Sequence, residues 1–211
     1  MNCTFDAALH AYYVDGRRVP SVTGVLAAVG ISTDFSRINQ AVLEHKRQLG
    51  AALHACLDYQ HDDDLDETTV DEEVRPLLDS YKLFMTDTGF KALDHELRRW
   101  PELNGMRYGM TADVIGAMGG EPWLIDFKTS AGAPSPGWAI QLAGYEAGLQ
   151  RPVIPPFRWR RMSLQLLPEG RYYKKEWTDP LDRQEWISAL YLVYRRINRG
   201  EPPWEDSQPA A

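Results

Sequence analysis

The middle of the chain changes from a helical to a strand-like hydrophobic pattern, and this change restricts the folds open to it. Three segments that read as strands follow one another, and a Gly119-Gly120 turn precedes the third. Two more segments of this kind come after a helical stretch at 138–149. The five segments are 91–100, 107–118, 122–130, 157–167 and 171–178. This order predicts a sheet that is covered by helices.

The flanking regions supply the helices and one hairpin. Asp15-Gly16, between two short β-prone arms, is typical of a type I′ turn, and Ser21 is placed to cap a short helix that Gly30 ends. Further helical periodicity covers residues from about 36 to 59, 73–89 and 182–200. We therefore predict one mixed α/β (α+β) domain over residues 1–204, with a central mixed β-sheet flanked by helices. Residues 1–35 would form the hairpin and short helix, and 205–211 a polar tail.

The net charge of −7 does not by itself exclude a nucleic-acid substrate. Eight acidic residues fall in the single run 62–73, and without them 22 acids face 23 bases. The rest of the chain is thus close to neutral, which leaves room for a local basic groove. The region 60–73 itself is predicted to be an acidic, mobile loop.

Composition also bears on cell compartment and cofactor class. No run of apolar residues approaches the roughly 20 needed to cross a bilayer, and the first residues lack the order of a secretory signal. Cys3 and Cys56 are too few for a four-thiolate iron–sulfur cluster, so we expect none. Two free thiols are typical of the cytoplasm, and we expect no membrane partner.

The run WLIDFKTS, 123–130, places charge in a strand that is otherwise apolar. Asp126 and Lys128 are two residues apart and therefore point to the same side of the strand. A carboxylate and an ammonium in this position must be paired, solvated in a cleft or bound to a metal. An ordinary salt bridge at a sheet edge is the structural alternative.

A second carboxylate can reach the same face. Asp113 lies on the preceding predicted strand, and a short turn between the strands can set it beside Asp126. Glu96, one strand earlier, could supply a third acid. Such oxygen ligands suit Mg²⁺ or Mn²⁺. With Lys128 placed to orient or stabilise an attacking water, the set fits phosphodiester hydrolysis.

Two helical pairs extend the pattern. Gly50 and His54 are four residues apart, as are Gln141 and Tyr145 on the helix after the D-x-K strand. Each pair is weak alone, but the ordered set G-x-x-x-H, E, D, D-x-K, Q-x-x-x-Y resembles the PD-(D/E)XK nuclease superfamily. The RecB-like branch that includes lambda exonuclease is the most similar, and the N-terminal hairpin resembles phage and prophage members. The resemblance implies a restriction-endonuclease-like core.

The resemblance also implies roles for individual residues. Asp113 and Asp126 would be the main metal ligands, together with the backbone carbonyl of Phe127. Lys128 would be the catalytic lysine. The family accepts Asp at the position of Asp126, where Glu is also found, whereas Met110 stands where glycine is common.

The remaining motif residues would support this centre. His54 resembles the helical histidine that ligates metal, and Glu96 resembles the upstream acid that supports catalysis. Gln141 and Tyr145 resemble the motif that lies beside the nucleic acid and orders the active centre.

The fourth predicted strand interleaves basic and aromatic residues. Arg158, Arg160 and Arg161 surround Trp159, a composition that can contact phosphates and stack on unpaired bases. A solvated, charged outer face of an edge hairpin explains the same residues equally well.

These patterns predict a metal-dependent DNA nuclease, more specifically an exonuclease that acts on ends or flaps. A role in recombination, replication or repair, with proteins of those processes as partners, follows by analogy. Two alternatives stay open: a nucleic-acid-binding accessory factor of the same fold with weak or no cleavage, and an unrelated α/β protein whose D-x-K is structural.

Overall fold

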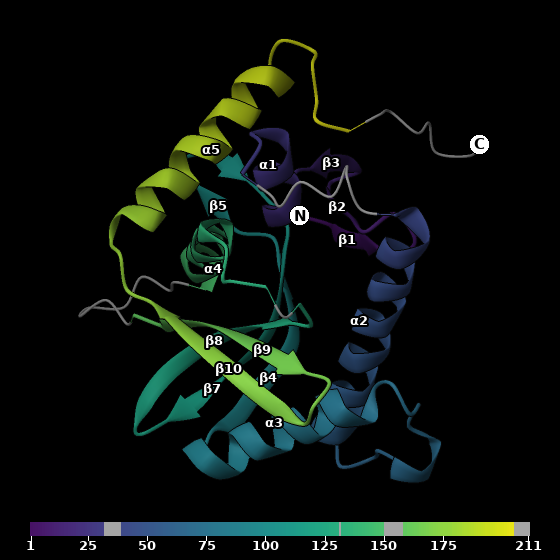
Figure 1. Cartoon of the computed structure of the whole chain (residues 1–211). Helices are drawn as coiled ribbons and strands as arrows, with labels where there is room; N and C mark the ends of the chain where they lie inside the picture. The colour runs from purple at the N-terminus through teal and green to yellow at the C-terminus, as the bar shows by residue number, and fades with distance from the viewer. Residues whose placement is uncertain (32–38, 131, 150–157, 205–211) are drawn as a thin grey trace.

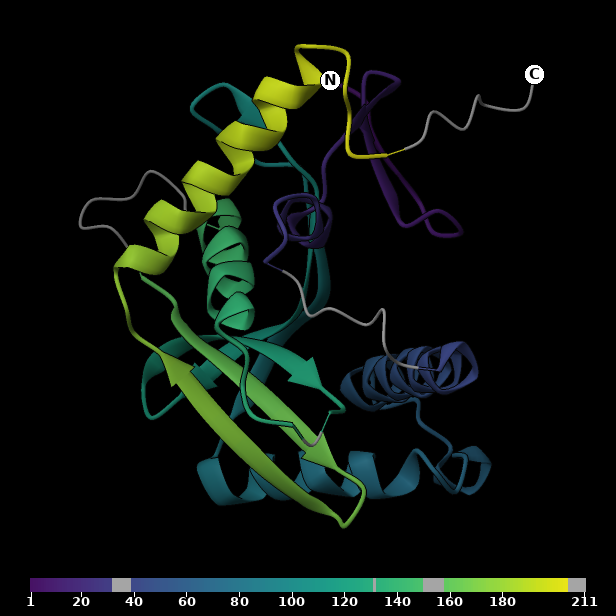
Figure 2. The same cartoon turned by 45° about the horizontal axis from the view of Figure 1, so that its top comes forward.

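The structure is a computed structural model, and it describes residues 1–31, 39–130, 132–149 and 158–204. Figures 1 and 2 show one domain in which helices cover both faces of a twisted central sheet. This is the mixed α/β architecture predicted from the sequence.

The central sheet has five strands in the order β10-β9-β8-β7-β4. Their bounds are β4 Lys91–Arg99, β7 Met110–Met118, β8 Glu121–Lys128, β9 Arg160–Leu167 and β10 Arg171–Trp177. Neighbours are antiparallel except for β8 and β9, which run parallel. A parallel pair needs a crossover connection, and helix α4, Pro136–Leu149, lies in that connection. The sheet is therefore mixed, as predicted.

Alternation along β8 sends its side chains into two separate hydrophobic cores. Trp123, Ile125 and Phe127 pack in the core beneath α2, Gln40–His61, and α3, Arg75–Thr88, whereas Leu124 packs in the other core. On that second side α4 lies against the sheet, and α1 and α5 pack on α4. These two helices span Val22–Ala28 and Leu181–Ile197. A strand buried on both faces explains why Asp126 and Lys128 need specific partners.

A small sheet of strands β1, β2 and β3 covers one end of the domain. Their bounds are Cys3–Asp6, Ala11–Val14 and Arg17–Val19. The predicted Asp15-Gly16 turn is confirmed, because both residues have positive φ angles, 48° and 75°. The Ser21 side chain accepts a hydrogen bond from the backbone N–H of Gly24, so the predicted cap of α1 is also confirmed. Strand β1 was not predicted.

Helix α3 ends where the sequence indicated, whereas α5 ends at Ile197, three residues before the predicted end at 200. Gly89, with a φ of 65°, ends α3, and the side chains of Leu77, Leu78, Tyr81 and Phe84 on that helix are buried. The Asn39 side chain caps α2, whose predicted start near 36 lies outside the described residues. Within the described residues, no helix is long and apolar enough to cross a membrane.

The acidic region 60–73 is partly organised. It contains the end of α2 and a short 3₁₀ helix, η1, Glu67–Thr69, which Asp66 caps. Lys82 of α3 forms an ion pair of 2.5 Å with Glu67. The predicted mobility of this region stays a prediction. A short hairpin made of two strands of two residues each, β5 Glu102–Leu103 and β6 Met106–Arg107, was not predicted.

Candidate functional site

Strands β7 and β8 bring two carboxylates together. Val114 pairs with Ile125, so Asp113 and Asp126, one residue further along each strand, stand across from each other. Asp126 is only 2% exposed. The backbone N–H of Phe127 donates a hydrogen bond of 2.7 Å to Asp113 Oδ2, which holds that carboxylate against β8. The Phe127 carbonyl remains a proposed ligand.

Strand β4 and helix α2 add an acid and an imidazole. Glu96 lies between the strand pairs His95–Val114 and Leu97–Ala112 and has a φ of 43°. This left-handed conformation is unusual for a residue with a side chain and is held only where the surroundings enforce it. Glu96 Oε1 is 2.8 Å from His54 Nδ1.

Three of these side chains can reach a common point. One ligand atom each from His54, Glu96 and Asp113 lies within 4.8 Å of the others. They come from α2, β4 and β7, so the fold rather than local sequence assembles the group. The structure thus places Glu96 as close to a shared point as the other two residues, although the resemblance gave it a supporting role.

The D-x-K strand and helix α4 form the other half of the site. Lys128 Nζ lies 2.6 Å from Asp126 Oδ2 and donates a hydrogen bond of 3.2 Å to Gln141 Oε1. The Gln141 amide in turn donates to Asp126 Oδ1 at 2.8 Å and to the Tyr145 hydroxyl at 2.9 Å. Gln141 and Tyr145 are 9% and 5% exposed; Gln141 contacts the acid–lysine pair, and Tyr145 contacts Gln141 behind it. Their proposed contact with nucleic acid remains a prediction.

Electrostatics couple the two halves. Burial, with the neighbouring Asp126 charge, raises the pKa of Asp113 to about 7, although His54 and Lys128 act in the opposite direction. Burial disfavours a charge on His54, but the Asp113 carboxylate and the hydrogen bond to Glu96 outweigh it and raise the pKa of His54 to about 9. Without metal, the imidazolium therefore serves as a counter-charge for the carboxylates.

The donor set fits a divalent cation. Asp126 Oδ2 is buried and receives no hydrogen bond, because the Lys128 ammonium is close to it but outside hydrogen-bond geometry. A buried carboxylate oxygen needs a positive partner, and here the Lys128 ammonium supplies it. His54, Glu96 and Asp113, whose ligand atoms lie within 4.8 Å of one another, offer carboxylate oxygens and one nitrogen, which suit Mg²⁺ and Mn²⁺.

The basic strand divides into residues with different environments. Arg158 is exposed, and Arg160 forms two hydrogen bonds of 2.8 Å with Glu176 while its guanidinium lies 4.4 Å from the Trp123 ring. Arg161, in contrast, is only 6% exposed and belongs to the core. The interpretation of all three arginines as one nucleic-acid surface is therefore wrong for Arg161, because its side chain points inward.

Sequence reasoning missed two neighbours of the site. Arg98 lies 3.8 Å from Glu96, and the Tyr12 hydroxyl is 2.5 Å from the Thr111 hydroxyl, two residues before Asp113 on β7. Alternation along β4 could have placed Arg98 on the side of Glu96. No local signal could have placed Tyr12, because its contact depends on how the N-terminal sheet docks.

Comparisons with known proteins give remote likenesses. No family model and no curated protein sequence matches the chain. Among solved structures, the chain is similar to SSO0001 with 15% identity and a TM-score of 0.44, over 91% of this chain and 82% of that one. It is also similar to the alkaline exonuclease LHK-Exo from Laribacter hongkongensis, with 16% identity and a TM-score of 0.42, over 86% of this chain and 92% of that one. The structure of the same exonuclease in complex with dAMP has 14% identity and a TM-score of 0.40, over the same shares of the two chains.

Asp113→Asn should distinguish a metal site from a structural ion pair. The pKa of Asp113 is raised in the folded state, so this carboxyl group favours folding while it is protonated. That contribution to stability is lost as the pH rises through about 7. At pH 8 in EDTA, the neutral variant should therefore melt no lower than wild type, since Asn retains an acceptor for the Phe127 N–H. Mn²⁺ at ten times its Kd should stabilise wild type by about 1.4 kcal/mol, a shift of a few degrees, and the variant much less.

Thermal melts of both proteins in EDTA and in Mn²⁺ measure these shifts. Glu121→Gln, at the exposed start of the same β8 strand, is the matched control and should respond to Mn²⁺ as wild type does. A large loss of stability for Asp113→Asn in EDTA would show that the carboxylate is a structural partner instead.

Proposed function

We propose that this protein is a divalent-metal-dependent DNA nuclease, and more specifically an exonuclease that acts on DNA ends or flaps. The observation that carries the proposal is the position of Lys128. Its ammonium lies between the Asp126 carboxylate and the Gln141 amide, on the strand next to Asp113. Carboxylates, an imidazole and a lysine on adjoining elements form the set of groups that phosphodiester hydrolysis needs.

The proposed division of labour follows the contacts. Asp113, Asp126, Glu96 and His54 would hold Mg²⁺ or Mn²⁺, with the Phe127 carbonyl as a further ligand. When bound, the cation would lower the pKa of water and offset charge on phosphate oxygens. The affinity of the site for the cation should rise as the pH increases toward 9, because His54 must lose its proton to act as a ligand.

The lysine and the helix residues would complete the centre. The Lys128 ammonium would orient the attacking water and stabilise the charge that develops on a non-bridging phosphate oxygen. Water adds to phosphorus and one P–O ester bond breaks, so no cofactor is consumed. Gln141, fixed by the Tyr145 hydroxyl, holds both Asp126 and Lys128 and thereby keeps their geometry constant.

Action on ends is the favoured mode for a domain of this size. Within the described residues, the elements of the chain belong to the central sheet, its covering helices and two small sheets. We identify among them no separate module that would read base sequence in a duplex groove. A phage-type role in recombination, replication or repair, in the cytoplasm of a bacterial cell, is part of this proposal and rests on the sequence resemblance.

Substrate topology tests the mode of action. In Mg²⁺ or Mn²⁺ the enzyme should degrade linear DNA and leave covalently closed circles of the same sequence intact. The two substrates are incubated in parallel and products are resolved by size, with a nicked circle as a third arm. Rapid linearisation of the closed circle would instead show an endonuclease.

A further inference from the structure

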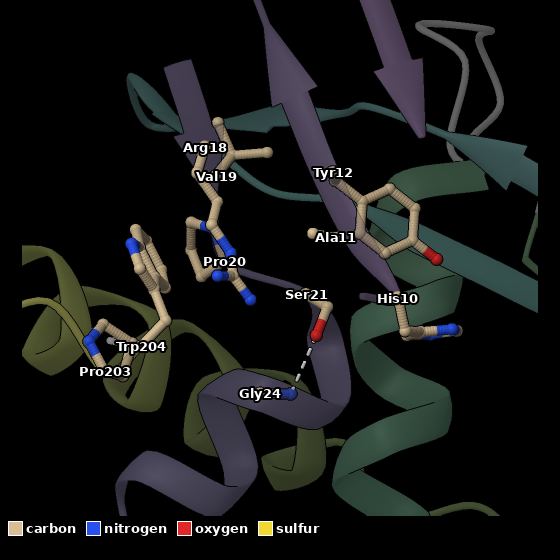
Figure 3. A pocket seen from close by; sticks show the side chains of 10 residues that line it. All are labelled: His10, Ala11, Tyr12, Arg18, Val19, Pro20, Ser21, Gly24, Pro203 and Trp204. Atoms are coloured by element: carbon tan, nitrogen blue, oxygen red, sulfur yellow. Dashed lines mark hydrogen bonds between the residues drawn. The ribbon is translucent and has the colours of Figure 1, made fainter. Parts of the chain in front are cut away.

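A cavity lies where the N-terminal sheet meets the end of the chain that the structure describes. It measures about 80 Å³, several times what one water molecule needs. Figure 3 shows its walls, which come from strands β2 and β3, the start of α1 and the segment after α5. The lining residues are His10, Ala11, Tyr12, Arg18, Val19, Pro20, Ser21, Gly24, Pro203 and Trp204.

The walls combine flat apolar groups with a cationic side chain. The Arg18 guanidinium lies over the Trp204 ring, 5.2 Å from its centroid, and Pro20 and Pro203 add further apolar surface. Within the described residues no acidic side chain lines the cavity, and Arg18 has no ion-pair partner there. His10 is exposed beside it. Within the described residues, the Arg18 guanidinium, stacked on the indole ring, therefore keeps its N–H donors and its outer face available to a ligand.

The cavity is fixed relative to the candidate active site. Gly109, just before β7, donates its N–H to the Pro20 carbonyl at 2.9 Å and accepts a bond of 3.1 Å from the Val22 N–H. A Cβ at Gly109 would lie 1.9 Å from the Tyr12 ring, so only glycine allows this approach. Tyr12 lines the cavity and also contacts Thr111 of β7.

Strand β7 connects the cavity with the candidate active site. Thr111 precedes Asp113 by two residues, which is roughly 7 Å along a strand and leaves both side chains on one face. A second contact runs through Arg98, which lies 3.8 Å from Glu96 and 4.7 Å from the centre of the Phe5 ring of β1. The N-terminal sheet that forms part of the cavity wall is thus in contact with β7 and β4, the two strands that carry Asp113 and Glu96.

We propose that this cavity binds one unpaired nucleobase of a DNA strand that also passes the acidic site. The proposal rests on the proposed function and specifies its substrate as single-stranded, or frayed at the end. Unpaired bases stack on aromatic rings and on guanidinium planes, and here Trp204 and Arg18 supply one of each. A phosphate group is a poorer fit, because phosphate sites gather several N–H donors around the oxygens.

Binding measurements without divalent cation test the proposal separately from cleavage. A short single-stranded oligonucleotide is compared with a series in which each member has one abasic position. For wild type, one position should weaken binding about five- to a hundredfold, the range for one stacked base. Trp204→Ala should bind the intact strand as weakly as wild type binds that abasic strand, and should lose sensitivity to the position. Trp204→Phe should retain most of the affinity and most of the sensitivity to that position.

Tyr191→Ala removes an aromatic ring that is 53% exposed on α5 and lines none of this cavity, so its abasic profile should equal that of wild type. Equal sensitivity in wild type and Trp204→Ala, or no binding of any strand, would overturn the proposal. A wild type that shows the sensitive position yet cleaves nothing in Mg²⁺ or Mn²⁺ would refute the nuclease function and leave the base pocket standing.

Discussion

Asp126→Asn is expected to reduce the rate of DNA cleavage by at least about a thousandfold while the protein stays folded. Asparagine retains an oxygen that can accept the hydrogen bond from Gln141, so the packing around α4 should persist. What is lost is the negative charge in a position that is 2% exposed, where water cannot replace it. The variant would therefore lack a metal ligand and the ion-pair partner of Lys128.

Lys128→Ala should give a loss of similar size, and the double variant should be little worse than either single one. Groups that act as a unit lose most of their effect when any member is removed. Lys91→Ala, which changes an exposed lysine at the start of β4, is the matched control and should cleave at the wild-type rate. The measurement is the initial rate of nucleotide release from linear DNA in Mn²⁺. Wild-type rates for either site variant would show that the active site lies elsewhere.

Arg161→Ala is expected to cost about 3–5 kcal/mol of folding free energy, because it leaves buried charges without a partner. Arg161 lies 2.9 Å from Asp182 Oδ2 and 3.4 Å from Glu146 Oε2. It also donates to the backbone carbonyls of Ala139 and Asp179 at 3.2 and 3.0 Å. One side chain thereby joins β9 to α4 and to the start of α5. For a chain of this length the loss corresponds to a fall of roughly 10 °C in melting temperature.

The neighbouring arginine provides the comparison. Arg160 pairs with Glu176 at the surface, where an ion pair contributes about 0–1 kcal/mol, so Arg160→Ala should melt within a few degrees of wild type. Thermal melts of the two variants at one pH measure the difference. If Arg161→Ala melted as wild type does and lost only DNA affinity, the original interpretation of the strand as a basic binding surface would apply to it after all.

The fold was predictable where local signals agree. Asp15-Gly16, Ser21 and Gly89 are conformational signals that act over a few residues, and the five main strands each carry their own hydrophobic pattern. Strand β1 and the β5–β6 hairpin are short and gain their order from pairing, so little in their own sequence distinguishes them from loops. The inward direction of Arg161 is also a tertiary property, since basic strands can be solvated or buried with acids from distant helices.

In the candidate site, too, local spacing was predictable and tertiary contacts were not. Spacing within β8 and across the turn to β7 was enough to expect Asp113, Asp126 and Lys128 on one side. The contact of His54 with Glu96 depends on how α2 packs beside β4, which spacing does not determine. The base pocket could not be predicted, because Trp204 and Arg18 are far apart in sequence and meet only after the N-terminal sheet docks at Gly109.

The most direct test of the metal-dependent nuclease is digestion of end-labelled single- and double-stranded DNA by wild type and by Asp126→Asn, in Mg²⁺, in Mn²⁺ and in EDTA. Products are resolved by length over time. We predict that wild type shortens labelled ends only when a divalent cation is present, and that the variant leaves them intact under every condition. Cleavage by wild type in EDTA, or equal cleavage by Asp126→Asn in Mn²⁺, would contradict the account.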